Sequence, residues 1–191
     1  MKLHYIKNLK DKYLDETIEL YIRAFPKDER FPIPDLVELI LKGKADCTVL
    51  LDSETFAGAS YQVFDKETVY ILFLAIDDRI RSKGYGTSFL KVIKESYDNR
   101  RIALLIESLS IRDAANFSER KKRESFYIKN GFQYGELSFK EPGGIFDLMI
   151  NGEPISKENM SRFFYDVIGE ALLNKWNAEI IKPQWENRKE E

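Results

Sequence analysis

Apolar residues recur every three or four positions in some parts of the chain and run without interruption in others. The uninterrupted runs "VYILFLAI" (69–76) and "IALLI" (102–106) are typical of strands buried on both faces. Because a predicted helix separates these two strands, we expect a parallel βαβ crossover at the centre of the fold. The helical spacing predicts helices at 13–25, 35–42, 89–97 and 117–130.

Shorter apolar segments flank this crossover. "CTVLLD" and "FAGASYQVF", separated by the turn-like "DSET", predict an antiparallel hairpin. "FQYGELSF" and "IFDLMI" predict a second antiparallel pair, with a Pro-Gly-Gly turn between them. Together these elements predict an α/β (α+β) fold with a mixed, mostly antiparallel central sheet flanked by helices.

After Pro154, apolar residues form one stripe at helical spacing. The stripe predicts a C-terminal amphipathic helix that packs on its own domain, with a homodimer interface as the alternative. We therefore expect a domain at 1–150, a helical extension at 151–175 and a partly disordered tail at 176–191. The stripe consists of Met160, Phe163, Phe164, Val167, Ile168, Ala171 and Leu172.

Composition limits the classes of partner and the compartment. The 30 basic and 32 acidic residues give a net charge of −2, which argues against a nucleic-acid partner. The sequence has no apolar stretch of membrane-spanning length and no apolar signal segment at its start, so we expect a cytoplasmic protein without a membrane partner. One cysteine, Cys47, and one histidine, His4, leave no zinc-type cluster, and no metal is expected.

The segment "RSKGYGTSFL" (81–90) joins the first buried strand to a predicted helix. A helix that begins at a tight glycine turn directs unpaired backbone N–H groups and the positive end of its dipole at the space beyond the strand. Gly84 and Gly86 carry no Cβ that would keep a phosphate from the backbone, Thr87 adds a hydroxyl, and Arg81 and Lys83 add positive charge. The segment therefore predicts an anion site.

Two common phosphate motifs do not fit this turn. A Walker loop needs a Lys-Ser/Thr pair after its second glycine, whereas Thr87 and Ser88 follow Gly86 directly. A dinucleotide fingerprint needs a third glycine at the position of Phe89. Taken alone, the turn is equally well explained as an ordinary connection from strand to helix.

The wider segment "LAIDDRIRSKGYGTSFL", with Arg81, Gly84 and Gly86, resembles the acyl-CoA-binding segment of the GCN5-related N-acetyltransferases (GNAT superfamily). Downstream, "SFYIKNGF" (125–132) is similar to the family's second hallmark, an aromatic helix end followed by Gly-Phe. The two segments lie in the family's order, and the resemblance covers 13–150. It implies a pair of central parallel strands that splay apart where the cofactor binds.

The resemblance also implies an activity. Members of the family transfer an acetyl group from acetyl-CoA to a primary amine, which attacks the thioester directly in a ternary complex. The residue inventory agrees with a route that has no covalent intermediate, because Cys47 is interpreted as a core residue rather than an activated nucleophile. The alternative function is a non-catalytic or regulatory CoA-binding protein with the same fold. A weaker alternative is a pure interaction module built on the C-terminal helix.

Carried over residue by residue, the resemblance assigns three roles to the strand and its turn. The backbone of the turn and the Thr87 hydroxyl would bind the pyrophosphate. Backbone groups of Leu74 and Ile76 would pair with the pantetheine arm, and an N–H of Ala75 or Leu74 would bind the oxyanion. The implied cofactor-binding residues are Leu74, Ala75, Ile76, Arg81, Ser82, Lys83, Gly84, Tyr85, Gly86 and Thr87.

Proton transfer is divided between an acid with a clear counterpart and a base without one. Tyr127 matches the tyrosine that protonates the departing thiolate in many relatives, whereas without the motif it would be interpreted as a packing residue. The position of the family's strand glutamate holds Tyr70, which is no base at neutral pH. Glu107 is the first replacement, although it could equally be a surface or helix-capping residue. Glu29 and a chain of water molecules are the other candidates.

One further departure concerns the helix of the second hallmark. Seven residues before Tyr127, relatives often carry an asparagine, and this chain carries Arg120. We hypothesise that Arg120 binds the phosphates of the cofactor by charge-assisted hydrogen bonds. The alternative is that the whole "RKKR" run is the solvated face of a helix.

Overall fold

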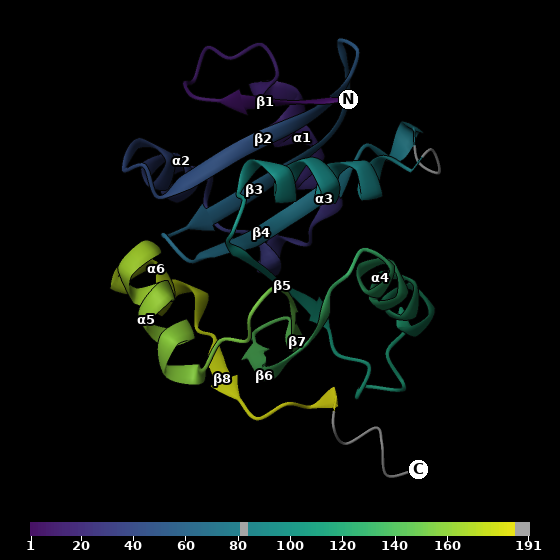
Figure 1. The fold of residues 1–191 in the computed structure, drawn as a ribbon, viewed down its shortest axis with the longest axis vertical. Coiled ribbons are helices and arrows are strands. Elements are labelled where there is room, and N and C mark those ends of the chain that lie inside the picture. Colours follow the sequence, from purple (N-terminus) through teal and green to yellow (C-terminus); the bar gives the residue numbers. More distant parts are fainter. Residues whose placement is uncertain (81–83, 186–191) are drawn as a thin grey trace. The chain divides into compact units, whose positions relative to one another are not determined.

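In the computed structural model, the chain divides into two units, Met1–Arg100 and Arg101–Glu191. The structure describes residues 1–80 and 84–185 (Figure 1). Each unit has its own antiparallel strands and its own helices, and we describe each by itself. The predicted domain division at 150 and the predicted extension at 151–175 stay predictions.

Four strands form the sheet of the first unit, each antiparallel to the next. The register places Ile6, Cys47, Tyr61 and Phe73 side by side in one row that crosses all four strands. This row is buried, with exposed fractions of 7 % or less. The strands are β1 (Lys2–Ile6), β2 (Ala45–Asp52), β3 (Thr55–Phe64) and β4 (Thr68–Ile76).

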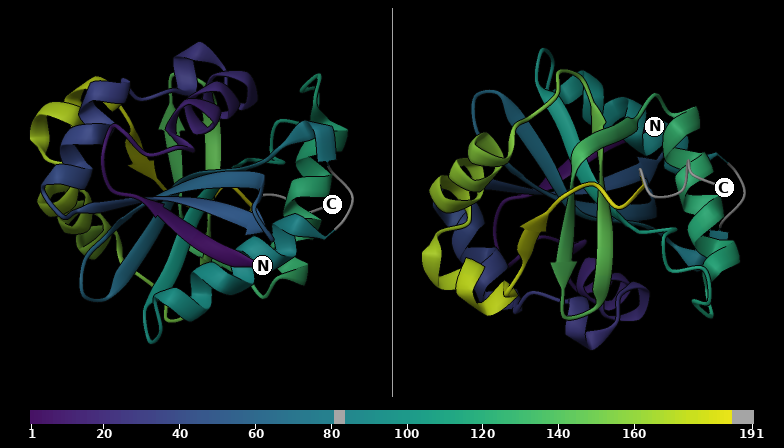
Figure 2. Two further views of the ribbon diagram at one scale, coloured as in Figure 1. Left: turned by 90° about the horizontal axis from the view of Figure 1, so that it is seen from above. Right: turned by 90° about the horizontal axis from the view of Figure 1, so that it is seen from below.

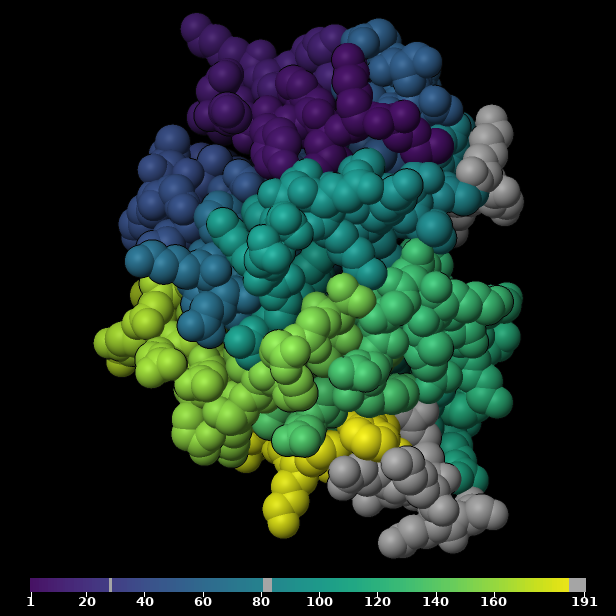
Figure 3. All heavy atoms as spheres, viewed as in Figure 1, coloured from purple at the N-terminus to yellow at the C-terminus, as the bar shows by residue number. Residues whose placement is uncertain are grey.

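Helices cover both faces of this sheet. Figure 2 shows α1 and α2 on one side of the strands and α3 on the other, and α3 lies at the viewed surface in Figure 3. Two helix boundaries agree with the sequence: α1 ends just before a proline, and α3 begins after the glycine turn. Their bounds are α1 (Leu14–Ala24), η1 (Lys27–Glu29), α2 (Ile33–Leu41), η2 (Asp78–Ile80) and α3 (Tyr85–Ser96).

The second unit contains a sheet in the order β5-β7-β6-β8, again antiparallel throughout. The predicted hairpin at its centre is confirmed, with its turn between Glu141 and Gly144. The predicted helix at 117–130 is confirmed as α4. The elements are β5 (Arg101–Glu107), α4 (Phe117–Lys129), β6 (Gln133–Glu141), β7 (Gly144–Asn151), α5 (Lys157–Val167), α6 (Glu170–Trp176) and β8 (Glu179–Ile181).

The C-terminal region differs from the expected single helix. The apolar stripe is divided between α5 and α6, because Gly169 adopts a φ of 85° that breaks the helix. Phe164 packs on Phe139 of β6 and on Trp176 of α6, so the stripe buries its apolar face on its own unit. The tail up to Trp185 is also structured: β8 pairs with β6, and the Trp185 indole donates a hydrogen bond of 2.9 Å to Gly135 O.

Candidate active site

The predicted glycine turn ends in a glycine with left-handed backbone geometry. Gly84 is the N-cap of α3 and has a φ of 74°, and a Cβ at this position would have no atom within 4 Å. The first turn of α3 contains no acidic residue, and no side chain of the described residues caps it. The backbone N–H groups at the start of a helix and the positive end of its dipole favour an anion, so this helix start suits one. The predicted contacts from Arg81, Ser82 and Lys83 lie outside the described residues.

Two tyrosines attach α3 to β2 at its two ends. The Tyr85 hydroxyl donates a hydrogen bond of 2.8 Å to Asp52, and the Tyr97 hydroxyl donates one of 2.5 Å to Asp46. Tyr85 is 7 % exposed, so it contributes to the predicted anion site through its backbone, as Gly86 does. The hydrogen bond that Tyr85 donates to Asp52 raises the pKa of Tyr85, and burial raises the pKa of Tyr97. These two bonds fix the direction in which the N-terminus of α3 points.

The end of β4 holds the residues predicted to contact the pantetheine arm. The Asp77 N–H donates a hydrogen bond of 3.0 Å to Ala57 O of β3. Along an antiparallel pair of strands, every second residue forms such bonds with the neighbouring strand. Ala75 therefore lies in a bonded position opposite Ala59, whereas Leu74 and Ile76 direct their backbone groups to the other edge of β4. This geometry suits the predicted roles of Leu74 and Ile76, and it favours Leu74 over Ala75 as the oxyanion donor.

A charged cluster follows β4 that the sequence analysis did not identify. The Asp77 carboxylate is 2 % exposed and binds the guanidinium of Arg79, with Nε at 2.9 Å from Oδ1 and Nη2 at 2.5 Å from Oδ2. Arg23 of α1 lies 3.6 Å from Asp77 and 2.9 Å from Asp78, and Arg79 also reaches Glu16. Hydrogen bonds from Arg79 lower the pKa of Asp77 below its ordinary value. The cluster ties η2, which precedes the glycine turn, to α1.

The sequence contained a signal for this cluster. "DDR" follows an apolar strand without any intervening turn residue, and charged residues at such a position need partners when they are buried. Its partners on α1 are more than fifty residues away in the sequence, so the pairing itself could not be predicted.

Glu29 lies in the loop between α1 and α2, as expected. It is the last residue of η1 and is exposed. Tyr21 of α1 holds the same loop, because its hydroxyl accepts a hydrogen bond of 2.9 Å from the Phe31 N–H and donates one of 3.3 Å to Phe31 O. Glu29 therefore lies on a loop with a defined connection to the sheet-covering helix.

In the second unit, the "SFYIKNGF" segment forms the end of α4. Gly131 has a φ of 82°, and the Phe132 N–H donates to Tyr127 O at 3.0 Å, which closes the helix. The half-buried ring of Tyr127 lies edge-on to Phe126 and Phe132, at centroid distances of 5.1 and 5.6 Å. Burial raises the pKa of Tyr127 to about 12, and the charge of Arg123 lowers it in part. The phenol is therefore neutral at physiological pH and keeps a proton to donate.

Glu107, at the end of β5, is brought together with Arg120. The Glu107 carboxylate accepts a hydrogen bond of 2.6 Å from the Asn116 side chain, lies 3.4 Å from Arg120 Nε and forms an ion pair with Arg123. The carboxylate that was expected to act as a base is therefore occupied by an amide and two guanidinium groups. The base role of Glu107 stays a prediction, and its geometry favours the structural alternative.

Arg120 uses its donors within the same cluster. Its guanidinium donates to the Asn116 side chain at 2.7 Å and to Ser108 O at 3.0 Å, and its side chain is 14 % exposed. An arginine with these partners anchors α4 to the segment after β5. Binding of cofactor phosphates by Arg120 stays a hypothesis, and it would require these bonds to be exchanged.

Within 1–80 and 84–185, no group of three or more His, Cys, Asp or Glu residues is placed to hold a metal ion. No helix in this part of the chain is long and apolar enough to cross a membrane.

Known proteins provide a comparison for this geometry. No family model matches the sequence, and no curated protein matches it. A GNAT-family protein from Bacteroides thetaiotaomicron has a similar structure, with a TM-score of 0.74 and 20% identity over 89% of this chain and 99% of its own.

Two further solved structures have a similar fold. The aminoglycoside 6'-N-acetyltransferase from Enterococcus faecium has a TM-score of 0.59 and 13% identity, covering 81% of this chain and 100% of its own. Arabidopsis thaliana Naa50, bound to the bisubstrate analogue CoA-Ac-MVNAL, has a TM-score of 0.58 and 17% identity, covering 80% of this chain and 100% of its own. The predicted fold class is confirmed: the chain has the α/β fold of the GNAT-family protein and of these two structures.

Proposed function

We propose that the protein is an acyl-CoA-dependent N-acyltransferase that transfers the acetyl group of acetyl-CoA to a primary amine. The observation that carries the proposal is the start of α3, where the left-handed Gly84 begins a helix that no described side chain caps, after β4 and η2. This arrangement fits a pyrophosphate, and it occurs in a chain with the fold of the acetyltransferases. Acetyl-CoA would supply the activated acyl group.

The proposed reaction proceeds by direct attack in a ternary complex. The neutral amine nitrogen attacks the thioester carbonyl, a C–N bond forms and the C–S bond breaks. The Leu74 N–H is the proposed donor to the oxyanion, and the Tyr127 phenol is the proposed donor of a proton to the thiolate. The amine loses one proton before the attack and one after it, so the reaction also needs a proton acceptor.

Water and Glu29 are the proton acceptors that we propose. Glu107 is less suited, because its carboxylate is bound by two arginines and an asparagine. Glu29 is exposed on the loop after α1 and can exchange protons with solvent. The Glu29 carboxylate and several tyrosines near the proposed amine site would suit a cationic amine, such as a polyamine, an amino sugar or a protein amine.

The second candidate function is a CoA-binding protein without turnover. Two observations favour it. Tyr70 stands where many members of the GNAT superfamily carry the strand glutamate, and the Glu107 carboxylate forms ion pairs with Arg120 and Arg123. Such a protein would keep the anion site of α3 and lack amine-dependent chemistry.

One measurement tests both functions together, and a second distinguishes them. Coenzyme A should raise the melting temperature under either function, because a ligand that binds only the folded state stabilises it. Amine-dependent release of thiol from acetyl-CoA, measured over a panel of polyamines, amino sugars and peptides, should occur only with the enzyme. Absence of stabilisation by coenzyme A would contradict both functions.

A further inference from the structure

The first unit contains an apolar pocket on the face of its sheet that α1 and α2 cover. The pocket has a volume of about 480 Å³, within the range of small-molecule sites. Its floor is the row of Ile6, Cys47, Tyr61 and Phe73 that crosses the four strands. α3, which carries the proposed cofactor site, lies on the opposite face of the same sheet (Figure 2).

Polar groups in the floor have partners inside the protein or are neutral. The Tyr61 hydroxyl donates a hydrogen bond of 2.6 Å to Leu36 O. The hydroxyl of Tyr21, which also lines the pocket, pairs with the backbone of Phe31. Burial raises the pKa of the Cys47 thiol to about 12, so this group stays protonated and behaves as a small apolar group. Thr17 also lines the pocket, and its buried hydroxyl has no hydrogen-bond partner among the described residues. Apart from this hydroxyl, the interior is poorly solvated by water and favours an apolar ligand.

The loop between β1 and α1 makes one side of the pocket polar and positively charged. Lys7, Asn8 and Lys10 line this side, and all three are exposed. Neither lysine forms an ion pair with any residue in the described part of the chain. The neighbouring carboxylate of Asp11 is already bound by His4 at 2.7 Å. Two uncompensated positive charges therefore border an apolar interior.

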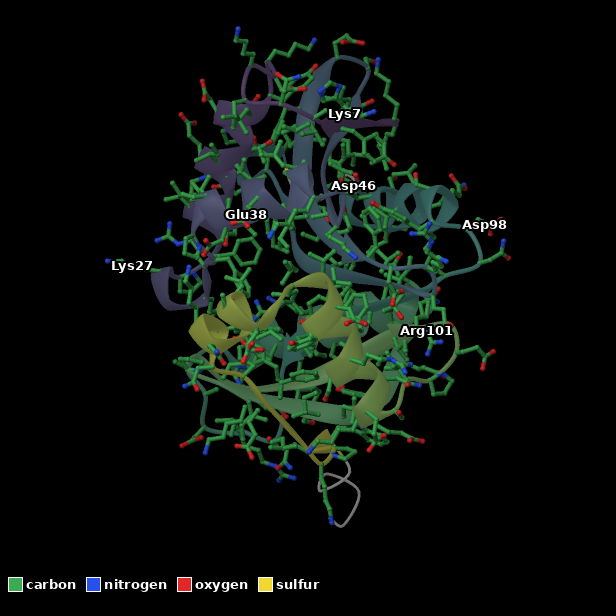
Figure 4. The ribbon with its side chains drawn as sticks, turned by 90° about the vertical axis from the view of Figure 1, so that its left-hand side faces the viewer. Lys7, Lys27, Glu38, Asp46, Asp98 and Arg101 are labelled. Carbon is green, nitrogen blue, oxygen red and sulfur yellow. The ribbon has the colours of Figure 1, made fainter. Side chains whose placement is uncertain are left out.

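We propose that this pocket binds a small amphipathic anion, an alkyl carboxylate, with its chain over the Cys47–Tyr61–Phe73 floor and its carboxylate at Lys7 and Lys10. The apolar interior selects the chain, and the two ammonium groups select the charge of the head group. Figure 4 shows Lys7 beside β1 and Glu38 on α2, the helix that closes the other side of the pocket. The site is independent of the proposed cofactor site and does not rest on the proposed function.

Decanoate is the probe, and decanol and decylamine are the matched ligands with a neutral and a cationic head group. Titration calorimetry should detect one decanoate per chain, with weaker binding of decanol and the weakest binding of decylamine. Lys7→Gln/Lys10→Gln should weaken decanoate by roughly three- to tenfold and leave decanol unchanged, because exposed ion pairs contribute little each. Lys44→Gln/Lys66→Gln, a pair of exposed lysines that do not line the pocket, is the charge control.

The apolar interior is tested by filling it. Val37 of α2 is half-buried and lines the pocket, so Val37→Trp should abolish binding of decanoate and of decanol. Val92→Trp on α3, also half-buried but outside the pocket, should retain binding, and circular dichroism establishes that each variant is folded. The lysine variants alter only exposed side chains, and they keep the proposal testable if Val37→Trp does not fold.

Three results would overturn the proposal. The first is the absence of decanoate binding to the wild-type protein, or equal binding to folded Val37→Trp. The second is competition between decanoate and coenzyme A, which would assign the ligand to the cofactor site. The third is a dimer that dissociates in Val37→Trp without any decanoate binding, which would assign the pocket to a second copy of the chain.

Discussion

The Tyr85 hydroxyl donates a hydrogen bond of 2.8 Å to Asp52, and this bond fixes the first turn of α3 to the last residue of β2. Tyr85 stands between the two glycines of the turn, so the residue whose N–H is predicted to contact the anion is also the one whose side chain binds the sheet. At the other end of α3, Tyr97 makes the corresponding bond to Asp46. The helix that is proposed to bind pyrophosphate is thus held at both ends.

Tyr85→Phe removes the hydroxyl and keeps the ring. We expect the variant to melt a few degrees lower and to bind coenzyme A several-fold more weakly, because the first turn of α3 loses its anchor. Tyr97→Phe is the control: it should lower the melting temperature and leave the affinity for coenzyme A close to that of the wild type. Equal affinity losses in the two variants would show that the bond from Tyr85 has no special effect on the site.

Gly84→Ala should combine a loss of stability with a loss of coenzyme A binding. An alanine at a φ of 74° costs about 1–2 kcal/mol, measured by urea unfolding, and the chain can relieve this strain only by moving the turn. Gly43→Ala is matched, because Gly43 has a φ of 66° and likewise no atom within 4 Å of an added Cβ. The control should lose similar stability but no affinity, and unchanged affinity in Gly84→Ala would argue against the turn as the phosphate site.

Asp77→Asn tests the charged cluster between η2 and α1. Its carboxylate is buried and bound by Arg79, although Arg79 is itself largely exposed, so we expect a loss of about 1–3 kcal/mol at pH 7. The pKa of Asp77 is lower in the folded protein, so its contribution is present above the unfolded value near 4 and disappears as the pH falls through the folded value.

Urea unfolding at pH 7 and pH 3 provides the measurement. The difference in stability between the wild type and Asp77→Asn should shrink at the lower pH, because Asp77 in the unfolded wild-type chain is protonated there and the charged form no longer favours folding as strongly. Asp78→Asn, at a more exposed neighbour, should have a smaller effect at pH 7. A difference that does not depend on pH would show that the charge of Asp77 is not what stabilises the cluster.

Glu107→Gln distinguishes a structural residue from a base. If Glu107 mainly holds Arg120 and Arg123, the variant should be less stable and keep turnover within about threefold of the wild type. If Glu107 is the base, kcat should fall by about a hundredfold or more, since general bases contribute that much. We expect the first result, measured by unfolding and by steady-state kinetics.

Tyr127→Phe should lower kcat by about a hundredfold and leave the affinity for coenzyme A unchanged. Because the folded pKa of the phenol is about 12, deprotonation of Tyr127 should cause no loss of activity below pH 10. Unchanged turnover in the variant would assign Tyr127 to packing against Phe126 and Phe132 alone.

Most helices and strands could be predicted from patterns among neighbouring residues. The run "VYILFLAI" and the glycines that follow it predict β4 and the start of α3, because burial on both faces and a positive φ each demand particular residues nearby. The division of the C-terminal stripe at Gly169 was missed, since the helical spacing continues across it. β8 was missed because its three residues acquire a pattern only through pairing with β6.

The residues of the candidate site likewise differ in how far the sequence predicts them. Gly84 and Tyr127 belong to local motifs and could be identified from their neighbours. The partners of the Asp77 cluster on α1 are more than fifty residues away in the sequence, so this cluster could not be predicted. The arginines that bind Glu107 come from α4, the next element of the chain, but their contact depends on how that helix packs. Cys47 was correctly interpreted as a buried residue, whereas the pocket above it depends on a row of residues from four strands.

The most direct test of the proposed function is amine-dependent release of coenzyme A from acetyl-CoA by the wild-type protein, with the N-acetylated product identified by mass spectrometry. At least one cationic amine should support turnover and become acetylated on nitrogen, and Gly84→Ala should reduce the rate at limiting acetyl-CoA. Stabilisation by coenzyme A without thiol release over the whole panel would contradict the enzyme and favour the CoA-binding protein.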